Sequence, residues 1–183
     1  MAIAKVVLVT GLPGTGKSTL GRELAWRHGL PLIAKDDIKE PLLDLLGAAN
    51  AAESRRLSDV SFAVLFRLAR ELSAAGASFV LEGNFRPGEH EAAMAEALST
   101  AELVQILCRV PEDERVARLE ARSNDPARHA GHLAGERLSV GAGASAGDAF
   151  LDLPSQRIVH DGANGHTVHV ALEHWMNLRA PSL

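Results

Sequence analysis

The sequence predicts an α/β domain built on a mostly parallel sheet. Short apolar runs of strand length alternate along the chain with longer segments of helical period, which is the pattern of that class. The 183 residues are 46% hydrophobic and 23% charged, a composition that suits one globular domain with a single core. The one cysteine, Cys108, lies among apolar residues, so we expect a core thiol in a reducing compartment and no disulfide within the chain.

Five apolar runs have the length of buried strands. The first, KVVLVT, is rich in β-branched side chains and suits a strand that is covered on both faces. The third, SFVLE, ends in the carboxylate of Glu82. The expected strands are residues 5–10, 30–34, 78–82, 103–110 and 157–160.

The segments between these strands have helical spacing and recognisable ends. Gly29 and Gly76 follow two of them, as glycine often does at a helix C-terminus, and Pro111 opens a third. The expected helices are residues 17–28, one that Asp36 or Asp37 can cap, 53–75, 89–98, 111–123 and 167–179. In the longest of them the spacing predicts one apolar face made by Leu57, Val60, Ser61, Val64, Leu65, Leu68 and Leu72.

Residues 124–147 differ from the rest of the chain. They contain Pro126 and five glycines, with arginine and histidine residues between them. We expect a lid or loop region there, with a short helix around residues 132–139, inside one domain that spans residues 1–183.

Charge and composition argue against several classes of partner. Nineteen Lys and Arg stand against 23 Asp and Glu, so a general electrostatic hold on nucleic acid or anionic lipid is not expected. The 4% aromatic content also argues against a surface that stacks bases. The apolar opening run is too short for a membrane span and leads into a glycine-rich loop, so we expect a cytoplasmic protein with no signal peptide and no membrane contact.

Residues 11–18 carry the most specific motif in the chain, and we call them the phosphate loop. Their sequence, GLPGTGKS, matches G-x-x-x-x-G-K-[ST] in full and lies between an expected strand and an expected helix. Glycines let successive amides turn toward an anion, and the helix N-terminus adds partial positive charge. Lysine at this place serves the β- and γ-phosphates, and the hydroxyl after it serves Mg²⁺. We expect ATP to be bound by Gly11, Pro13, Gly14, Thr15, Gly16, Lys17, Ser18 and Thr19.

Carboxylates follow two further strands, at the edge where a parallel sheet collects its ligands. Asp36 and Asp37 come after the second expected strand, and either can accept the proton of an attacking hydroxyl or cap the next helix. Glu82 ends the third strand, where it can hold Mg²⁺ through water; the alternative is a solvated loop acid. We favour the functional interpretation for both places.

Arginine and histidine residues gather near the glycine-rich region. Arg118 and Arg122 share one helix face, Arg128 follows in the region itself, and we expect at least one of the three to close over the transferred phosphate. The alternative is surface ion pairing with Glu114 and Glu120. No zinc site is expected, because zinc needs three or four convergent ligands.

The motifs taken together resemble those of a known enzyme group. GLPGTGKST, KDDIKE, VLEGNFR, an Arg-x-x-x-Arg helix and an RHAGH loop follow in this order. Proteins similar in this way are the small P-loop kinases, a group with zeta-toxin-like proteins, the polynucleotide 5′-kinase domain, gluconate kinase and chloramphenicol phosphotransferase. The resemblance covers residues 5 to about 161. It implies a five-stranded parallel sheet in the order 2-3-1-4-5, with helices on both faces and a lid after the fourth strand.

The same resemblance implies roles for individual residues. Its polynucleotide-kinase-like members use an Asp as base and a basic residue three positions later as substrate contact, and Asp36 and Lys39 have that spacing here. This favours Asp36 over Asp37, although the usual second residue is Arg. The lid arginines of the family correspond by position to Arg118 and Arg122, and residues 161–165 correspond to the loop that holds the adenine edge.

We therefore expect an ATP- and Mg²⁺-dependent kinase that acts on a hydroxyl of a small molecule, as a monomer or homodimer. Asn84 and Arg86 are expected to contact the acceptor together with Lys39, in a pocket that also takes in Arg55, Phe62, Phe66 and His90. Two alternatives stay open: an NTPase that needs no acceptor, and a nucleotide-binding regulator or toxin-like protein that acts through a partner.

Overall fold

The structure, a computed structural model, describes residues 3–123, 148–162 and 164–177. Every strand and helix expected within these residues is present, with ends that differ by one or two positions. The elements are β1 (Ala4–Gly11), α1 (Lys17–His28), β2 (Leu32–Ala34), α2 (Lys35–Leu46), α3 (Ala51–Ala74), β3 (Phe79–Glu82), α4 (Glu91–Ala97), β4 (Ala101–Cys108), α5 (Glu112–Ser123), β5 (Gln156–His160) and α7 (Gly165–Asn177). The expected lid at residues 124–147 lies outside the described residues.

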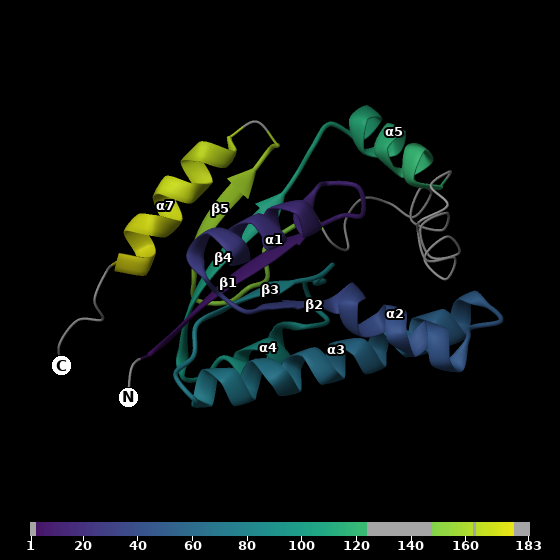
Figure 1. The fold of residues 1–183 in the computed structure, drawn as a ribbon, viewed down its shortest axis with the longest axis horizontal. Coiled ribbons are helices and arrows are strands. Elements are labelled where there is room, and N and C mark those ends of the chain that lie inside the picture. The colour runs from purple at the N-terminus through teal and green to yellow at the C-terminus, as the bar shows by residue number, and fades with distance from the viewer. Residues whose placement is uncertain (1–2, 124–147, 163, 178–183) are drawn as a thin grey trace.

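The five strands form one parallel sheet in the order β2-β3-β1-β4-β5 (Figure 1). β1 is the central strand, paired with β3 on one side and with β4 along its whole length on the other. The α/β class and the strand order implied by the resemblance are therefore confirmed: this is a P-loop NTPase fold. Because all strands run the same way, their carboxyl ends meet at one edge of the sheet.

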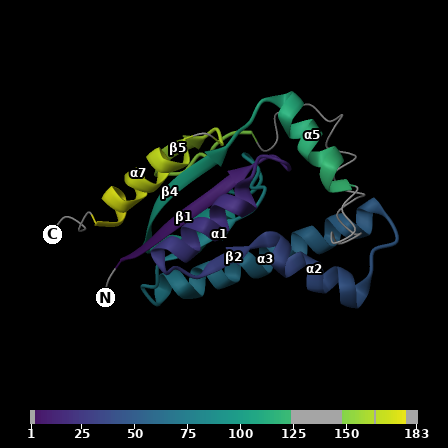
Figure 2. The same cartoon turned by 45° about the horizontal axis from the view of Figure 1, so that its top comes forward.

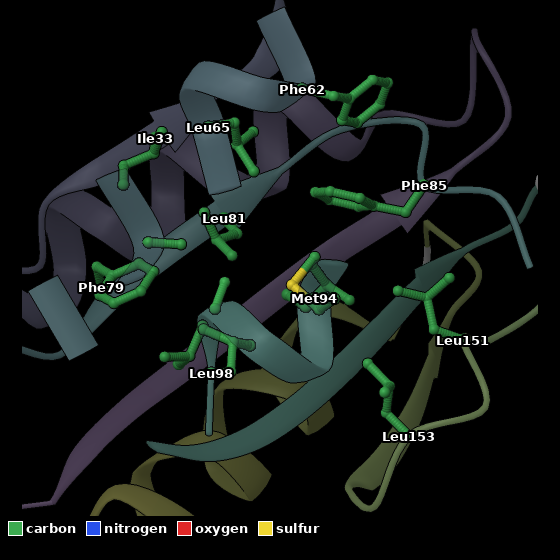
Figure 3. Packing of buried hydrophobic residues seen from close by; sticks show 14 residues of the cluster. Ile33, Phe62, Leu65, Phe79, Leu81, Phe85, Met94, Leu98, Leu151 and Leu153 are labelled. Carbon is green, nitrogen blue, oxygen red and sulfur yellow. The ribbon is translucent and has the colours of Figure 1, made fainter. Parts of the chain in front are cut away.

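Side chains of β1 alternate between two apolar cores, one on each face of the sheet. Val6 and Leu8 belong to the core covered by α3 and α4, which Figure 3 shows around Met94. Val7 and Val9 belong to the core covered by α1 and α7. Burial on both faces is what the uninterrupted apolar run of the first strand predicts.

The face that α3 buries differs from the expected one. Val60, Val64 and Leu68 are exposed, so this part of the prediction was wrong. The buried residues of the helix are Ser54, Ser61, Phe62, Leu65, Ala69 and Ser73. Serine and alanine beside Phe62 and Leu65 let the helix approach its neighbours closely, and a pattern of large apolar residues cannot reveal such a face.

Two helices flank the carboxyl edge of the sheet. α5 and α2 lie on opposite sides of the end of β1, and both views show the phosphate loop between them (Figures 1 and 2). Among the described residues no helix is long and apolar enough to cross a bilayer. The edge framed by α5 and α2 is where the predicted site residues are found.

Candidate active site

The phosphate loop connects the end of β1 to the start of α1, and its backbone depends on glycine. Gly11 and Gly14 have φ angles of 145° and 89°, which L side chains rarely adopt. A Cβ atom on Gly11 would lie 2.5 Å from the Cys108 carbonyl oxygen and 2.9 Å from Thr15 Oγ1. Strand β4 therefore packs directly against the first residue of the loop, and no other amino acid fits there.

Side chains of the loop divide into buried and exposed ones. Thr15 is buried, and its hydroxyl donates a 2.8 Å hydrogen bond to the Leu12 carbonyl oxygen, which closes the turn. Lys17 is buried too, with 9% of its surface exposed. Ser18 is half-buried, whereas Thr19 is exposed on α1. The loop thus presents one ammonium and one hydroxyl at the start of a helix.

Glu82 meets both of these groups from the end of β3. Its carboxylate lies 3.9 Å from Lys17 Nζ, and only 2% of the residue is exposed. Burial raises the pKa of Glu82, while the Lys17 ammonium and a hydrogen bond with Ser18 oppose that rise. The alternative of a solvated loop acid is wrong, because Glu82 is enclosed beside the phosphate loop.

Asp36 and Asp37 lie in the first turn of α2, directly after β2. Neither caps the helix: its N-cap is Ala34, with no side-chain hydrogen bond, so the capping alternative was wrong. Asp36 accepts a 2.9 Å hydrogen bond from Lys35 Nζ, and Asp37 forms an exposed 3.6 Å ion pair with Arg22. Asp36 raises the pKa of Glu82 more than Asp37 does, so Asp36 is the carboxylate more strongly coupled to Glu82.

Lys39 is buried one turn further along α2. Its Nζ donates a 2.9 Å hydrogen bond to the hydroxyl of Ser54 on α3. Lys35, which precedes it by one turn, is also buried. Burial first, and then the nearby Lys35 charge, lower the pKa of Lys39 from 10.5 to about 8. Two buried ammonium groups therefore lie near Asp36, and the one on Lys35 is paired with it.

The arginines of α5 contact the outer side of the phosphate loop. Arg118 Nη1 lies 3.4 Å from the Gly14 carbonyl oxygen, and the same side chain pairs with Glu114. Arg122 is half-buried in the last turn of α5, and Arg128 lies outside the described residues. Phosphate-loop contact and surface ion pairing therefore occur together at Arg118.

Arg115 was not among the expected site residues. The residue is only 5% exposed; its guanidinium donates to the Pro13 carbonyl oxygen at 3.2 Å and pairs with Glu112 through two hydrogen bonds of 2.7 and 2.6 Å. The Glu112 hydrogen bond raises the pKa of Arg115 and lowers that of Glu112. The spacing of Glu112 and Arg115 signals an ion pair, but nothing local signals its burial.

Several residues of the expected acceptor pocket contact one another or their neighbours. Phe62 and His90 are buried against one another, with ring centroids 4.2 Å apart, so they belong to the core. Arg86 forms hydrogen bonds with both carboxylate oxygens of Glu89, and its backbone N–H donates to His90 Nδ1 at 3.0 Å. Asn84 is half-buried beside them.

The loop after β5 is fixed by one asparagine. Asn164 Nδ2 donates to the Val159 carbonyl oxygen, and the Asn164 backbone N–H donates to Asp161.

In the described part of the chain no three His, Cys, Asp or Glu side chains come together as a metal-binding group.

Known proteins are similar to this chain in sequence. The family model described as AAA domain matches residues 6–137. A protein of Mycobacterium tuberculosis is 31% identical over 131 residues, covering 67% of this chain and 26% of that protein. The chain thus spans about a quarter of that relative's length. An adenylate kinase of Mycolicibacterium vanbaalenii is 30% identical over 129 residues, covering 65% of this chain and 71% of the enzyme.

Solved structures are similar in fold. A candidate kinase from Chloroflexus aurantiacus superposes with a TM-score of 0.84 at 27% identity, covering 94% of this chain and 98% of that one. The APS kinase of Mycobacterium tuberculosis, solved with AMPPNP and APS, has a TM-score of 0.58 at 17% identity, covering 97% and 100%. At 17% identity, the similarity to the APS kinase supports the fold alone. With its phosphate loop, its strand order and these relatives, the chain belongs to the AAA domain family and is a P-loop kinase-like protein.

Proposed function

We propose that this protein is an ATP- and Mg²⁺-dependent phosphotransferase that phosphorylates a hydroxyl group of a small molecule. The observation that carries the proposal is the arrangement at the carboxyl ends of three adjacent strands. Lys17 and Ser18 follow β1, Glu82 ends β3, and Asp36 follows β2. Phosphate-binding, metal-supporting and proton-accepting groups are thus lined up along one edge of the sheet.

The nucleotide side of the proposal rests on the phosphate loop. Its amides and Lys17 bind the phosphates of ATP, and the other nucleotide-binding residues are Gly11, Pro13, Gly14, Thr15, Gly16 and Thr19. Ser18 and, through water, Glu82 hold Mg²⁺; hydroxyl and carboxylate oxygens are ligands that this hard cation accepts together with phosphates. Bound Mg²⁺ supplies charge neutralisation at the transferred group. The enclosed position of Glu82 beside Ser18 fits this assignment.

The acceptor side rests on Asp36. Its carboxylate orients the acceptor hydroxyl and takes its proton as the phosphoryl group is transferred. Lys39, Asn84 and Arg86 are the side chains assigned to contact the acceptor. Arg118, Arg122 and Arg128 supply positive charge to the transferred phosphate, and the contact of Arg118 with the phosphate loop supports its share in this role.

The buried lysines bear on the chemical class of the acceptor. A buried ammonium group is costly unless an anion or several hydrogen-bond acceptors surround it. Lys39 has the Ser54 hydroxyl as its hydrogen-bond partner in the described part of the chain. An acceptor that carries a carboxylate or phosphate beside its hydroxyl would neutralise this charge, so anionic acceptors are favoured over neutral ones.

A second candidate function is transfer to a nucleoside monophosphate. The 30% identity with an adenylate kinase favours it, since that enzyme's name implies a phosphate as acceptor. AMP therefore belongs in any acceptor screen.

The test is a measurement of ADP release from ATP with matched acceptors. The panel pairs sugars with sugar acids and nucleosides with nucleoside monophosphates, and adds antibiotics and short 5′-hydroxyl oligonucleotides. We expect acceptor-dependent turnover that Lys17→Ala abolishes and Asp36→Asn lowers by about 100-fold or more. Asp37→Asn is the matched control and is expected to keep nearly full turnover, because Asp37 is in an exposed ion pair.

The outcomes separate the proposal from its rivals. ATP turnover that no acceptor changes and that Asp36→Asn leaves intact indicates an acceptor-independent NTPase. Tight ATP binding without turnover indicates a nucleotide-binding regulator. Full activity of Lys17→Ala would refute the assignment of the phosphate loop.

A further inference from the structure

Arg115 connects the phosphate loop to a helix that contacts the loop from outside. Its guanidinium uses Nε and Nη2 for the two carboxylate oxygens of Glu112 and Nη1 for the Pro13 carbonyl oxygen. The Arg115 side chain is nearly fully buried, whereas Glu112 is exposed on the first turn of α5. Pro13 and Arg115 are 102 positions apart in the sequence, so this contact joins two separate parts of the fold.

The contact between Arg115 and Pro13 involves the peptide group that joins Pro13 to Gly14. The Pro13–Gly14 peptide is trans, so its carbonyl oxygen and its N–H point in opposite directions. Because Arg115 draws the Pro13 oxygen toward α5, the Gly14 N–H is turned away from α5. Arg115 therefore contacts the peptide group that carries one N–H donor of the phosphate loop.

The packing around Gly14 supports the same arrangement. A Cβ atom on Gly14 would lie 3.0 Å from the Arg115 carbonyl oxygen, 3.1 Å from Arg115 Cγ and 3.2 Å from Leu119 Cγ. The backbone of α5 therefore lies directly against the loop at the residue whose amide is being oriented. Glu112 keeps the guanidinium in one plane, since a bidentate pair fixes both position and orientation.

We propose that Arg115, held in place by Glu112, is a positioning residue that orients the Gly14 amide for the phosphates of the nucleotide. This inference rests on the proposed nucleotide binding and adds to it a contribution from outside the loop. A lysine would keep the positive charge but would lose the fork that serves Glu112 and Pro13 together. The role therefore requires the shape of the guanidinium as well as its charge.

The experiment measures nucleotide affinity by calorimetry for the full chain with Mg²⁺ present. ATP, ADP and adenosine are the probes, because adenosine lacks the phosphates that the loop would bind. Glu112→Ala and Arg115→Lys are each expected to weaken ATP and ADP by about tenfold and to leave adenosine unchanged. Asp113→Ala is the matched control: it removes an acidic residue from the same helix turn without touching Arg115, and it should bind ATP like the wild type.

The outcomes are distinguishable from failure of the proposed function. Wild-type protein that takes up no ATP overturns both proposals. Wild-type binding that Glu112→Ala and Arg115→Lys leave unchanged overturns this inference alone. An equal loss for ATP and adenosine also overturns it, because a general loss of structure would then explain the result. Since Glu112 is exposed, its variant is expected to fold even where a change at Arg115 does not.

Discussion

The phosphate side and the acceptor side of the candidate site are built in different ways. On the phosphate side, the eight consecutive residues 11–18 act mainly through their backbone, and the glycines permit that backbone. On the proposed acceptor side, the groups are side chains from separate elements: Asp36 and Lys39 of α2, Ser54 of α3 and Arg86 after β3. The phosphate side therefore tolerates little change in geometry, whereas the acceptor side can change its chemistry one side chain at a time.

The largest effect is expected from a change to the loop backbone. Gly11→Ala places a methyl group 2.5 Å from the Cys108 carbonyl oxygen at a φ of 145°. We expect the free energy of unfolding to fall by about 3 kcal/mol and ATP binding to become undetectable. Chemical denaturation and calorimetry measure the two effects.

The control for this change is another glycine with positive φ. Gly29 has a φ of 63° at the end of α1, and nothing lies within 4 Å of the place where its Cβ would be. Gly29→Ala is expected to cost about 1 kcal/mol and to leave ATP affinity unchanged. If both variants lost ATP binding equally, packing of Gly11 against β4 would not be what determines the conformation of the phosphate loop.

On the acceptor side a single side chain should change stability and function in opposite directions. Lys39 carries a buried charge with one hydroxyl partner among the described residues, so Lys39→Met is expected to stabilise the protein at pH 7 by about 1 kcal/mol. The same variant should lose activity toward anionic acceptors. Ser54→Ala is the matched control: it removes the hydroxyl partner of Lys39 and should destabilise the protein.

The pH dependence of stability provides a sharper measure of Lys39. Its pKa is lowered from the ordinary value of 10.5 to about 8 in the folded protein, so the unfolded chain binds more protons between these pH values. Stability should therefore rise from pH 8 to 10.5 in the wild type, and Lys39→Met should remove that rise. Urea denaturation at pH 7, 8, 9 and 10 measures it; a rise that persists in the variant would show that another group is responsible.

The smallest effect is expected at His90, which packs against Phe62. Burial is the main cause that lowers the pKa of His90 below 6.5, and Arg86 adds to it, while Glu89, Glu91 and Asp59 oppose it. The neutral ring accepts the Arg86 N–H at Nδ1, so its stabilisation is present above pH 6.5 and is lost as pH falls through the lowered pKa. His90→Asn keeps an acceptor near this place without a titrating group, and its stability should depend less on pH below 6.5.

Sequence patterns predicted the fold and the phosphate loop because both follow from local rules. The apolar run of β1 and the glycine spacing after it each have one structural solution, and both were found. Asp36 and Glu82 could be placed because residues that end parallel strands share one edge. The roles assigned to these residues remain proposals.

Other features depend on packing between distant segments, which local patterns do not contain. Glu112 and Arg115 look like any exposed i, i+3 pair, and only the docking of α5 on Pro13 buries the arginine. The buried face of α3 was partly mispredicted for a related reason, since Phe62 and Ala69 face inward where Val60 and Val64 do not.

The contact at Gly14 has a consequence for protein engineering. Because Arg115 and Leu119 occupy the space where a side chain at this glycine would be, the eight-residue loop is not a self-sufficient cassette. A chimaera that moves residues 11–18 into another sheet without the 112–119 segment would leave the outer surface of the loop bare. The two segments together are therefore the smallest unit that would carry the phosphate loop into a new scaffold.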